Sequence, residues 1–398
     1  MRRTILGGFV TTVLTLLATP GTATEQDQEW RLTPGGWASG AVEYIRTVPF
    51  EAGTGIDAVL HGKYLYTTSW RSFSIYDVSS ALNPQLLSQT PTPGQLINEN
   101  PQTNGKILLL SNDNIGRTLD IYDVSNKAAP AKIASYADLE RNHIWECVLD
   151  CEYAYGATGA ILDLSDPAKP QRVGNWTAAK RPTGGFHSIE EVAPGLVLTG
   201  SSPMLLLDAR TDPANPVLLA ELKPKTTKPP RPYVIIGGAP NSLPARVAWP
   251  SDATSRYVLV SMETPFSGDC AEHSGSFLTY DSQGWNEPGF DGFEQVDEYR
   301  MTDNGLPNEG SAPVNFFGCT SYGLDVNGSY DTNGLVGTAW FEHGTRVLRV
   351  GGDGKLSEVA GFVGHGGNAV RPVWRNDEVL YVIDFHRGID VLYVNDEG

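Results

Sequence analysis

The sequence predicts an all-β fold, a seven-bladed β-propeller whose ring is closed by an N-terminal strand that joins the last blade. Three observations predict it. First, the chain repeats a unit made of an apolar strand, a short turn, a strand of the type IYDVS and a proline. Second, the unit recurs at intervals of about 40–45 residues, a period that is typical of propellers when it carries only strand patterns. Third, 43 glycines and 27 prolines are scattered along the chain, as many short strands joined by turns require.

The third strand of each unit fixes the number of blades. An acidic or equivalent residue marks this strand seven times, at Asp77, Asp123, Asp163, Asp208, Asp281, Arg349 and Tyr393. A propeller blade is a meander of about four strands, and packing blades face to face buries surfaces that a single meander would leave exposed. Seven third strands therefore predict seven blades.

The last unit lacks a fourth strand, because the chain ends in VLYVNDEG directly after the third. Residues 42–48 (VEYIRTV) precede the first full unit, and we predict that they form the outer strand of the seventh blade. The predicted domain organisation is a signal peptide over residues 1–23, an N-terminal extension over 24–41 and the propeller over 42–398.

The repeat units resemble the LVIVD repeats of exported bacterial seven-bladed propellers. The resemblance lies in YLYTTSWRSFSIYDVSSALNP (64–84), EYAYGATGAILDLSDPAKP (152–170) and PMLLLDARTDPANP (203–216). It extends over most of residues 42–395 and implies the fold, but it implies no particular activity.

The N-terminal segment MRRTILGGFVTTVLTLLATPGTATEQ has the form of a secretory signal peptide. Two arginines precede an apolar run from Ile5 to Leu17 that is too short to span a membrane, and cleavage is expected after Ala23. We therefore expect a secreted, extracellular protein with no membrane span. The formal net charge of −17 disfavours nucleic acid and anionic membranes as partners.

The four cysteines are Cys147, Cys151, Cys270 and Cys319. In an exported chain they predict two disulfides, one between the first two, which flank a tight turn, and one between the last two.

One face of the propeller is predicted to carry the chemistry. Strands of a blade run alternately up and down, so the loops that enter innermost strands share a face with the second-to-third turns. Three long irregular segments (223–244, 263–275 and 302–319) are expected there, and long loops on a rigid scaffold are where binding and catalysis concentrate. Six of the seven histidines are predicted on the same face: His143, His187, His273, His343, His365 and His386.

Innermost strands line the central channel, and their polar residues are in register. Thr54, His143, His187 and Tyr322 are predicted near its entrance, and three residues deeper come Asp57, Glu146, Glu190 and Asp325, with Arg246 and Arg371 in the same ring. Narrow propeller channels collect polar groups for structural reasons alone. The constellation as a whole nevertheless indicates a ligand-binding or catalytic site.

The function that this pattern favours is a polysaccharide lyase that cleaves a uronic-acid-containing glycan by β-elimination. Such a reaction needs a cation beside the carboxylate, a base for the α-proton and an acid for the leaving oxygen. Arg246 and Arg371 suit the first role, and His143 or His187 the second. The third role suits Tyr322 or His386, and His343 completes the candidate catalytic set.

The candidate substrate-binding residues lie at the same mouth. Trp70 and Trp340, in second-to-third turns, offer planes on which sugars stack. The polar candidates are Arg71, Glu146, Glu190, Arg371 and Arg387. Paired carboxylates, either Glu146 with Glu190 or Asp57 with Asp325, would instead permit glycoside hydrolysis.

Two other classes remain open. The histidines His143, His187, His343 and His386, with Glu146, Glu190 or Glu342, have the ligand types of a metal site, although no two of them have a diagnostic spacing. A divalent metal such as calcium, zinc or manganese is therefore a possible cofactor. The last class is a propeller without catalysis that binds a glycan, another small extracellular ligand, a peptide or a protein.

Overall fold

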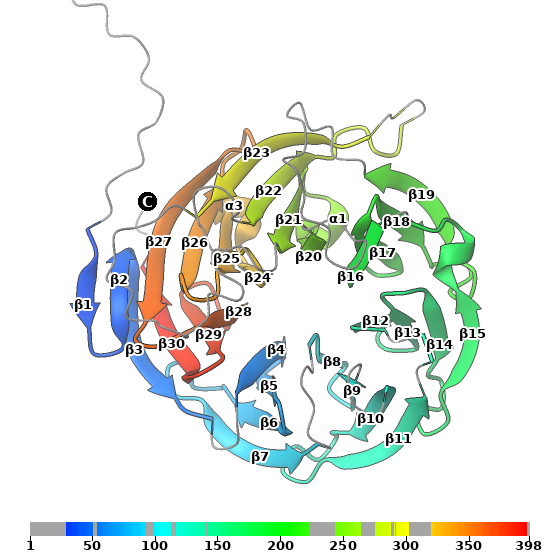
Figure 1. Cartoon of the computed structure of the whole chain (residues 1–398), viewed down its shortest axis with the longest axis horizontal. Helices are drawn as coiled ribbons and strands as arrows, with labels where there is room; N and C mark the ends of the chain where they lie inside the picture. Colours follow the sequence, from blue (N-terminus) through cyan, green and yellow to red (C-terminus); the bar gives the residue numbers. More distant parts are fainter. Residues whose placement is uncertain are drawn as a thin grey trace, which may run out of the picture.

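The structure is a computed structural model. It describes residues 29–50, 54–92, 99–112, 117–137, 139–140, 142–182, 184–222, 243–263, 275–287, 290, 292–301 and 320–395. The strands of these residues form seven antiparallel sheets arranged as blades around a central axis (Figure 1). The predicted seven-bladed β-propeller is confirmed.

The first four blades each have four strands in sequence order from the channel outward. Blade 1 contains β4 (Gly55–His61), β5 (Tyr64–Ser69), β6 (Ser72–Asp77) and β7 (Gln85–Pro91). Blade 2 contains β8 (Gln102–Thr103), β9 (Ile107–Asn112), β10 (Thr118–Asp123) and β11 (Ala131–Ala137). Blade 3 contains β12 (Trp145–Val148), β13 (Tyr153–Gly156), β14 (Ala160–Asp163) and β15 (Gln171–Asn175), followed by the 3₁₀ helix η1 (Trp176–Ala178). Blade 4 contains β16 (Gly184–Ala193), β17 (Leu196–Ser202), β18 (Met204–Asp208) and β19 (Val217–Leu222).

The remaining blades include two short helices and the N-terminal strands. Blade 5 contains β20 (Leu243–Ala248), α1 (Pro250–Ala253), β21 (Tyr257–Glu263), β22 (Ser276–Asp281) and β23 (Glu294–Arg300). Blade 6 contains β24 (Leu324–Val326), α3 (Tyr330–Asn333), β25 (Leu335–Ala339), β26 (Thr345–Val350) and β27 (Leu356–Gly364), extended by β2 (Gly36–Gly40) and β1 (Arg31–Thr33). Blade 7 contains β28 (Ala369–Trp374), β29 (Val379–Asp384), β30 (Gly388–Val394) and β3 (Val42–Val48).

The ring closes through the predicted N-terminal strand. Strand β3 pairs antiparallel with β30, from Val42 opposite Val394 to Val48 opposite Ile389. The segment before it, which the sequence assigned to an N-terminal extension, continues the sheet of blade 6, because β2 pairs with β27. Strands near both ends of the described part of the chain are thus bound into the ring, which joins residues far apart in sequence.

The repeated Asp and Pro residues form the predicted turns. The carboxylate of Asp77 accepts a hydrogen bond of 2.8 Å from the backbone N–H of Ser79, and Asp123 and Asp163 do the same two residues ahead. Such side-chain caps satisfy backbone donors where the ladder ends. The apolar residues of the middle strands pack between neighbouring blades, as Ile75 of blade 1 does against blade 2.

One predicted disulfide is present. Cys147 and Cys151 are bonded across the β12–β13 turn, with 4.4 Å between their Cα atoms. Cys270 and Cys319, predicted as the second pair, lie outside the described residues. Within the described part of the chain, no helix is long and apolar enough to cross a membrane.

Candidate functional site

Each blade contributes a polar residue to a ring across the channel. Six of these residues are those that the sequence placed there, and the seventh, Asn100, lies two residues before the short strand β8. The ring consists of Asp57, Asn100, Glu146, Glu190, Arg246, Asp325 and Arg371, in order from blade 1 to blade 7.

Arg246 is the hub of this ring. Its guanidinium is ion-paired with Asp57, lies 3.1 Å from Glu190 Oε1 and donates a hydrogen bond to Asn100 Oδ1. The residue is only 3% exposed. Burial opposes its charge, but the carboxylates of Asp57 and Glu190 more than offset this and raise the pKa of Arg246. Its donors are used inside the protein, so Arg246 is a structural cation.

Asn100 connects the ring to the residue before it, Glu99. The Asn100 backbone N–H donates to Asp57 Oδ2 at 2.8 Å, and its side-chain amide donates to Trp145 O at 3.2 Å and Glu146 Oε2 at 3.3 Å. Asn100 has a φ of 54°, in the left-handed region that asparagine tolerates better than most residues. These bonds fix the backbone that carries Glu99.

Two buried acids of the ring, Glu146 and Asp325, resist ionisation. Burial, followed by the negative charge of Glu190, raises the pKa of Glu146 well above its usual range. Burial likewise raises the pKa of Asp325 to about 6, although Arg371 acts in the opposite direction. Arg371 itself donates to Leu324 O at 2.7 Å. The ring thus holds the innermost strands together by a dense set of internal contacts.

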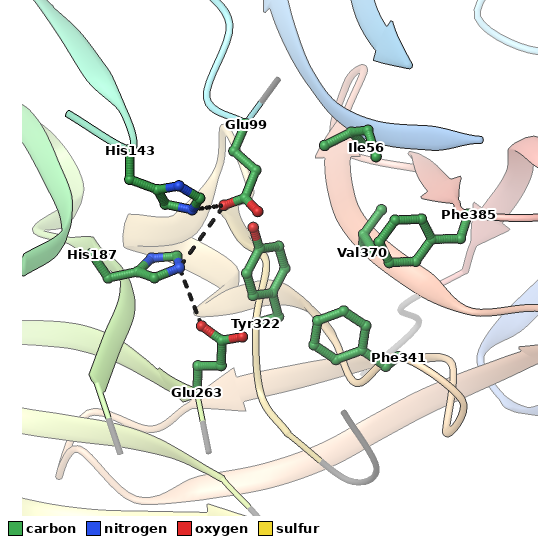
Figure 2. Close-up of a pocket in the computed structure, with 9 residues that line it drawn as sticks. All are labelled: Ile56, Glu99, His143, His187, Glu263, Tyr322, Phe341, Val370 and Phe385. Carbon is green, nitrogen blue, oxygen red and sulfur yellow. Dashed lines mark hydrogen bonds and ion pairs between the residues drawn. The ribbon is translucent and has the colours of Figure 1, made fainter. Parts of the chain in front are cut away.

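A cavity of about 130 Å³ lies next to this ring, on the side where the chain enters the innermost strands. Figure 2 shows its two unlike sides, with Tyr322 between them. The lining residues are Glu99, His143, His187, Glu263 and Tyr322 on the polar side, and Ile56, Phe341, Val370 and Phe385 on the apolar side. Of the candidates from the sequence, His143, His187 and Tyr322 line this cavity.

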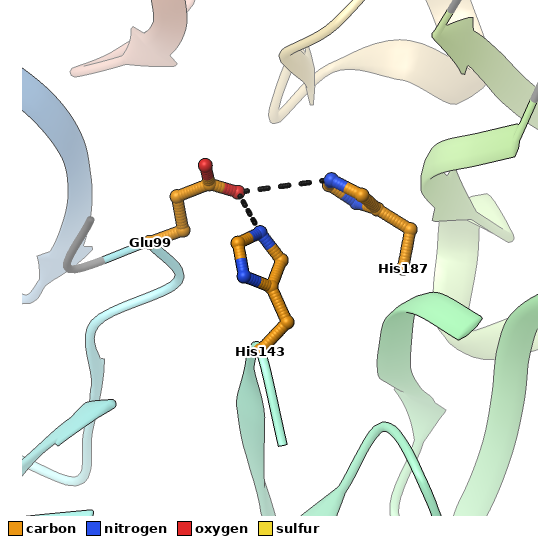
Figure 3. Close-up of side chains that lie close together, drawn as sticks. All are labelled: Glu99, His143 and His187. Carbon is orange, nitrogen blue, oxygen red and sulfur yellow. Dashed lines mark hydrogen bonds and ion pairs between the residues drawn. The ribbon is translucent and has the colours of Figure 1, made fainter. Parts of the chain in front are cut away.

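Two histidines and two carboxylates meet on the polar side. His143 Nε2 lies 3.0 Å from Glu99 Oε2. His187 Nε2 lies 3.1 Å from Glu263 Oε2 and 3.9 Å from Glu99 Oε2 (Figures 2 and 3). The two imidazole rings are 4.9 Å apart between centroids. These four residues come from blades 2, 3, 4 and 5. They are distant in sequence, and the propeller fold brings them together.

The orientation of His187 is set by the backbone of blade 5. Its Nδ1 lies 3.3 Å from the carbonyl oxygen of Ala245, which can only accept a hydrogen bond, so Nδ1 carries the proton. Nε2 therefore points at the carboxylates of Glu99 and Glu263. Three acceptor atoms facing one another repel unless a cation, either a proton or a metal ion, lies between them.

Tyr322 and Glu99 differ in protonation, because the pKa of Tyr322 is raised and the pKa of Glu99 is lowered. Burial and the nearby charge of Glu99 raise the pKa of Tyr322 well above its usual range, so its hydroxyl keeps the proton and donates it in a hydrogen bond to Glu99. Burial alone would raise the pKa of Glu99, but its interactions with His143, with His187 and with the Tyr322 hydroxyl hold it well below the usual range. Glu99 is thus an anion within the cavity.

The polar side has the composition of a metal site. One ligand atom from each of Glu99, His143 and His187 lies within 4.8 Å of the other two (Figure 3). Imidazole nitrogen with carboxylate oxygen suits zinc, manganese and similar ions, whereas calcium prefers oxygen ligands alone. Of the cofactors considered from the sequence, zinc and manganese fit this donor set and calcium does not.

Several other candidates lie apart from the cavity. His343 and His386 are in the β25–β26 and β29–β30 turns, and among the described residues neither lines the cavity. Trp340 is fully buried and packs edge-on against Tyr299, so it offers no face on which a sugar could stack. The guanidinium of Arg387 contacts both carboxylate oxygens of Asp390, at 2.9 and 2.8 Å, and so joins β30 to its own turn.

The remaining candidates lie at the rim or outside the described residues. Trp70 and Arg71 form the β5–β6 turn, on the same face of the propeller as the cavity, and Trp70 is 42% exposed. His273 lies outside the described residues. Two lining carboxylates, Glu99 and Glu263, were not among the candidates from the sequence, and each borders an irregular segment without repeat pattern.

Comparison with known proteins agrees with the fold. The LVIVD repeat family matches residues 115–138, which include β10 and β11. The β-propeller domain of Cps50 (Swd1) from Myceliophteria thermophila is similar in structure, with a TM-score of 0.57 and 12% sequence identity over 89% of this chain and 100% of that domain. No curated protein matches the sequence. The chain therefore carries an LVIVD repeat within a seven-bladed propeller, and the similarity at this level of identity concerns the fold alone.

Proposed function

We propose that this chain is a metal-dependent enzyme whose active site is the cavity at the channel mouth. The observation that carries the proposal is the convergence of Glu99, His143 and His187, whose ligand atoms lie within 4.8 Å of one another. Two imidazoles and a carboxylate are a ligand set of catalytic metal sites that keep a coordination position open for water or substrate.

The orientation of His187 supports the metal site. The Nδ1–H of His187 donates to a backbone carbonyl, an arrangement typical of metal-ligating histidines because it fixes the tautomer and aims Nε2 at the ion. Glu263 lies 3.1 Å from that Nε2 and is placed either to act as a fourth ligand or to accept a proton. A divalent ion would relieve the repulsion between the acceptor atoms of Glu99, Glu263 and His187.

The other polar group of the cavity supplies a proton donor. Tyr322 retains its hydroxyl proton at neutral pH because its pKa is raised by burial and by Glu99. Metal ions in such sites polarise a substrate oxygen or activate water, and a neighbouring acid completes the proton transfer. In this proposal Tyr322 is the acid and Glu263 the base.

A polysaccharide lyase that cleaves uronic-acid glycans is the second candidate. Tyr322 beside two imidazoles favours it, because elimination needs an acid and a base on the same site. Two observations oppose it. Arg246, the expected partner of the uronate, is buried and paired with Asp57 and Glu190, and the polar side of the cavity carries two carboxylates. In this structure the metal ion would have to neutralise the uronate.

Export of the chain is part of the proposal. The Cys147–Cys151 disulfide supports it, because structural disulfides persist mainly in oxidising compartments.

The first test is metal binding by the purified chain. Protein stripped with a chelator is titrated with zinc and manganese by calorimetry, and bound metal is counted by elemental analysis. We expect one ion per chain and an affinity at least about 100-fold lower in His143→Ala and in His187→Ala. His386→Ala is the matched control, because this histidine is on the same face but does not line the cavity. Equal affinity in all four proteins would overturn the proposal.

The second test is turnover. Metal-loaded and metal-free protein are incubated with small alcohols, esters and aldehydes and with uronate polysaccharides, and products are followed by mass and by ultraviolet absorbance of unsaturated uronate. Turnover that requires metal and disappears in Tyr322→Phe supports the enzyme. A rise in absorbance with the polysaccharides favours the lyase, whereas metal binding without any product indicates a binding propeller.

A further inference from the structure

The apolar side of the cavity is built from three blades that do not supply the histidines. Ile56 belongs to β4, Val370 to β28, and Phe341 and Phe385 follow β25 and β29. Ile56, Phe341 and Val370 are each 3% exposed or less. Figure 2 shows these four side chains gathered opposite the histidines, with the Tyr322 ring at the boundary.

Aromatic packing gives this side a fixed shape. The Phe341 ring lies 5.0 Å from the Tyr322 ring and 6.2 Å from the Phe385 ring, to which it is nearly parallel, at 17°. Phe341 is further fixed by its backbone, which exchanges two hydrogen bonds with Ala369. A rigid wall of this kind selects ligands by size, because core side chains at native packing density yield little space.

The volume limits the ligand. A cavity of about 150 Å³ lined by apolar side chains accommodates one benzene molecule, and the cavity here measures about 130 Å³. The space inside the cavity therefore holds a group of about that size, and the rest of a larger ligand would have to extend out of the opening. Part of the volume adjoins the histidines, so the hydrocarbon portion of a ligand is smaller still.

The charge of the site limits the ligand in a second way. Glu99 and Glu263 bring two negative charges to the polar side, which a divalent ion would neutralise. Beside these carboxylates and a divalent ion, a neutral ligand adds no charge, whereas an anion adds a charge that this partly buried site disfavours.

We infer that the site takes a compact neutral molecule with one donor atom for the metal, and that the whole molecule, its hydrocarbon part included, is about the size of benzene. This inference rests on the proposed function and deepens it. The donor atom would bind beside Glu99, His143 and His187, within reach of Tyr322, and the hydrocarbon part would lie against Phe341 and Val370.

Neutral nitrogen heterocycles of increasing size test the inference. Zinc-loaded protein is titrated by calorimetry with pyrazole, 4-methylpyrazole and 4-phenylpyrazole, and with acetate as a small anion. We expect 4-methylpyrazole to bind best and both 4-phenylpyrazole and acetate to bind at least tenfold more weakly. Equal or tighter binding of 4-phenylpyrazole or acetate would contradict the size limit or the charge preference, respectively.

Two variants of one residue locate the hydrocarbon part. Val370→Phe should fill the apolar side and weaken 4-methylpyrazole at least tenfold with zinc still bound, whereas Val370→Ala should enlarge it and admit 4-phenylpyrazole. Near-ultraviolet circular dichroism confirms that each variant is folded. If Val370→Phe does not fold, Val370→Ala alone decides, since unchanged size selection in it would overturn the inference.

A further titration distinguishes failure of the proposed metal site from failure of the inference about the ligand. The metal-free chain is titrated with benzene, which has about the size of the whole cavity and needs no metal. Benzene binding that Val370→Phe abolishes would support the apolar side even if zinc did not bind, and absence of benzene binding to the wild type would refute it whatever the metal result.

Discussion

The guanidinium of Arg246, from blade 5, is ion-paired with the carboxylate of Asp57, from blade 1, inside the channel. Both residues are almost completely buried, at 3% and 1% exposure. The same Asp57 carboxylate accepts the backbone N–H of Asn100 at 2.8 Å, directly beside Glu99. This ion pair therefore connects the buried ring of polar residues to Glu99, which lines the cavity.

Removing the cation should destabilise the fold strongly. Arg246→Leu leaves Asp57 buried without its partner, and breaking one side of a buried ion pair costs about 3–5 kcal/mol. We expect a loss of that size in the free energy of unfolding, measured by urea denaturation. Arg256→Leu in the same blade is the control, because its ion pair with Asp281 is exposed and such pairs contribute about 1 kcal/mol or less. Equal losses in the two variants would contradict a structural role for Arg246.

Asn100 is expected to act as a positioning residue for Glu99. Asn100→Gly keeps the positive φ of 54° accessible but removes the amide that bonds Trp145 and Glu146. We expect zinc affinity to fall about 10- to 100-fold, as for other losses of groups that orient metal ligands. The measurement is calorimetric titration with zinc.

A purely structural role for Asn100 predicts a different pattern. In that case Asn100→Gly lowers the free energy of unfolding, measured with urea, and leaves zinc affinity unchanged. Gln102→Ala is the control, because it removes the side-chain bond to Asn100 Oδ1 and leaves the pairing of β8 with β9 in place.

The fold could be predicted from the sequence because the segment that forms each blade contains its own repeat pattern. The pattern of apolar strands depends on contacts within one blade, and so do the turns capped by Asp77, Asp123 and Asp163. One continuous segment of the chain therefore contains all the residues needed to predict one blade. The closure by residues 42–48 followed in the same way, from a missing fourth strand.

The candidate site could be predicted only in part. His143, His187 and Tyr322 were found because each lies three residues before a ring residue in a recognisable innermost strand. Glu99 was not predicted because the strand that follows it, β8, has only two residues and gives no periodic signal. The roles of Arg246 and Trp340 depend on neighbours from other blades, and single-sequence patterns carry no information about those contacts.

The short disulfide should stabilise the β12–β13 turn. Leu149, Asp150 and Cys151 all have a positive φ, near 55–62°, a conformation that costs free energy in residues other than glycine. Cross-linking a loop this short contributes about 2 kcal/mol through the entropy of the unfolded chain. We expect the double variant Cys147→Ser, Cys151→Ser to lose about that much in urea unfolding and to keep its zinc affinity. Unchanged stability would indicate that the turn persists without the bond.

Asp384 should make the stability of the propeller depend on pH. Burial, followed by the charge of Asp390, raises the pKa of this carboxyl to about 7 in the folded chain, from an ordinary value of 3.8. Between pH 4 and 7 the folded state therefore binds a proton that the unfolded state has released. The free energy of unfolding then falls as pH rises, by up to about 1.4 kcal/mol per pH unit, and the contribution is fully present only below about pH 4.

Asp384→Asn isolates this contribution. The variant keeps only one of the two acceptor oxygens that receive the backbone N–H groups of Asn368 (Oδ2) and of His386 and Arg387 (Oδ1), so we expect it to be less stable than the wild type at pH 5. Its pH dependence should be shallower, so the gap should narrow or reverse by pH 8, as measured by urea unfolding at each pH. Asp77→Asn is the control, because the Asp77 pKa is lowered to about 2 by its bonds to Ser79 and its effect is lost only below pH 4. Parallel curves for the wild type and Asp384→Asn would show that another group carries the pH dependence.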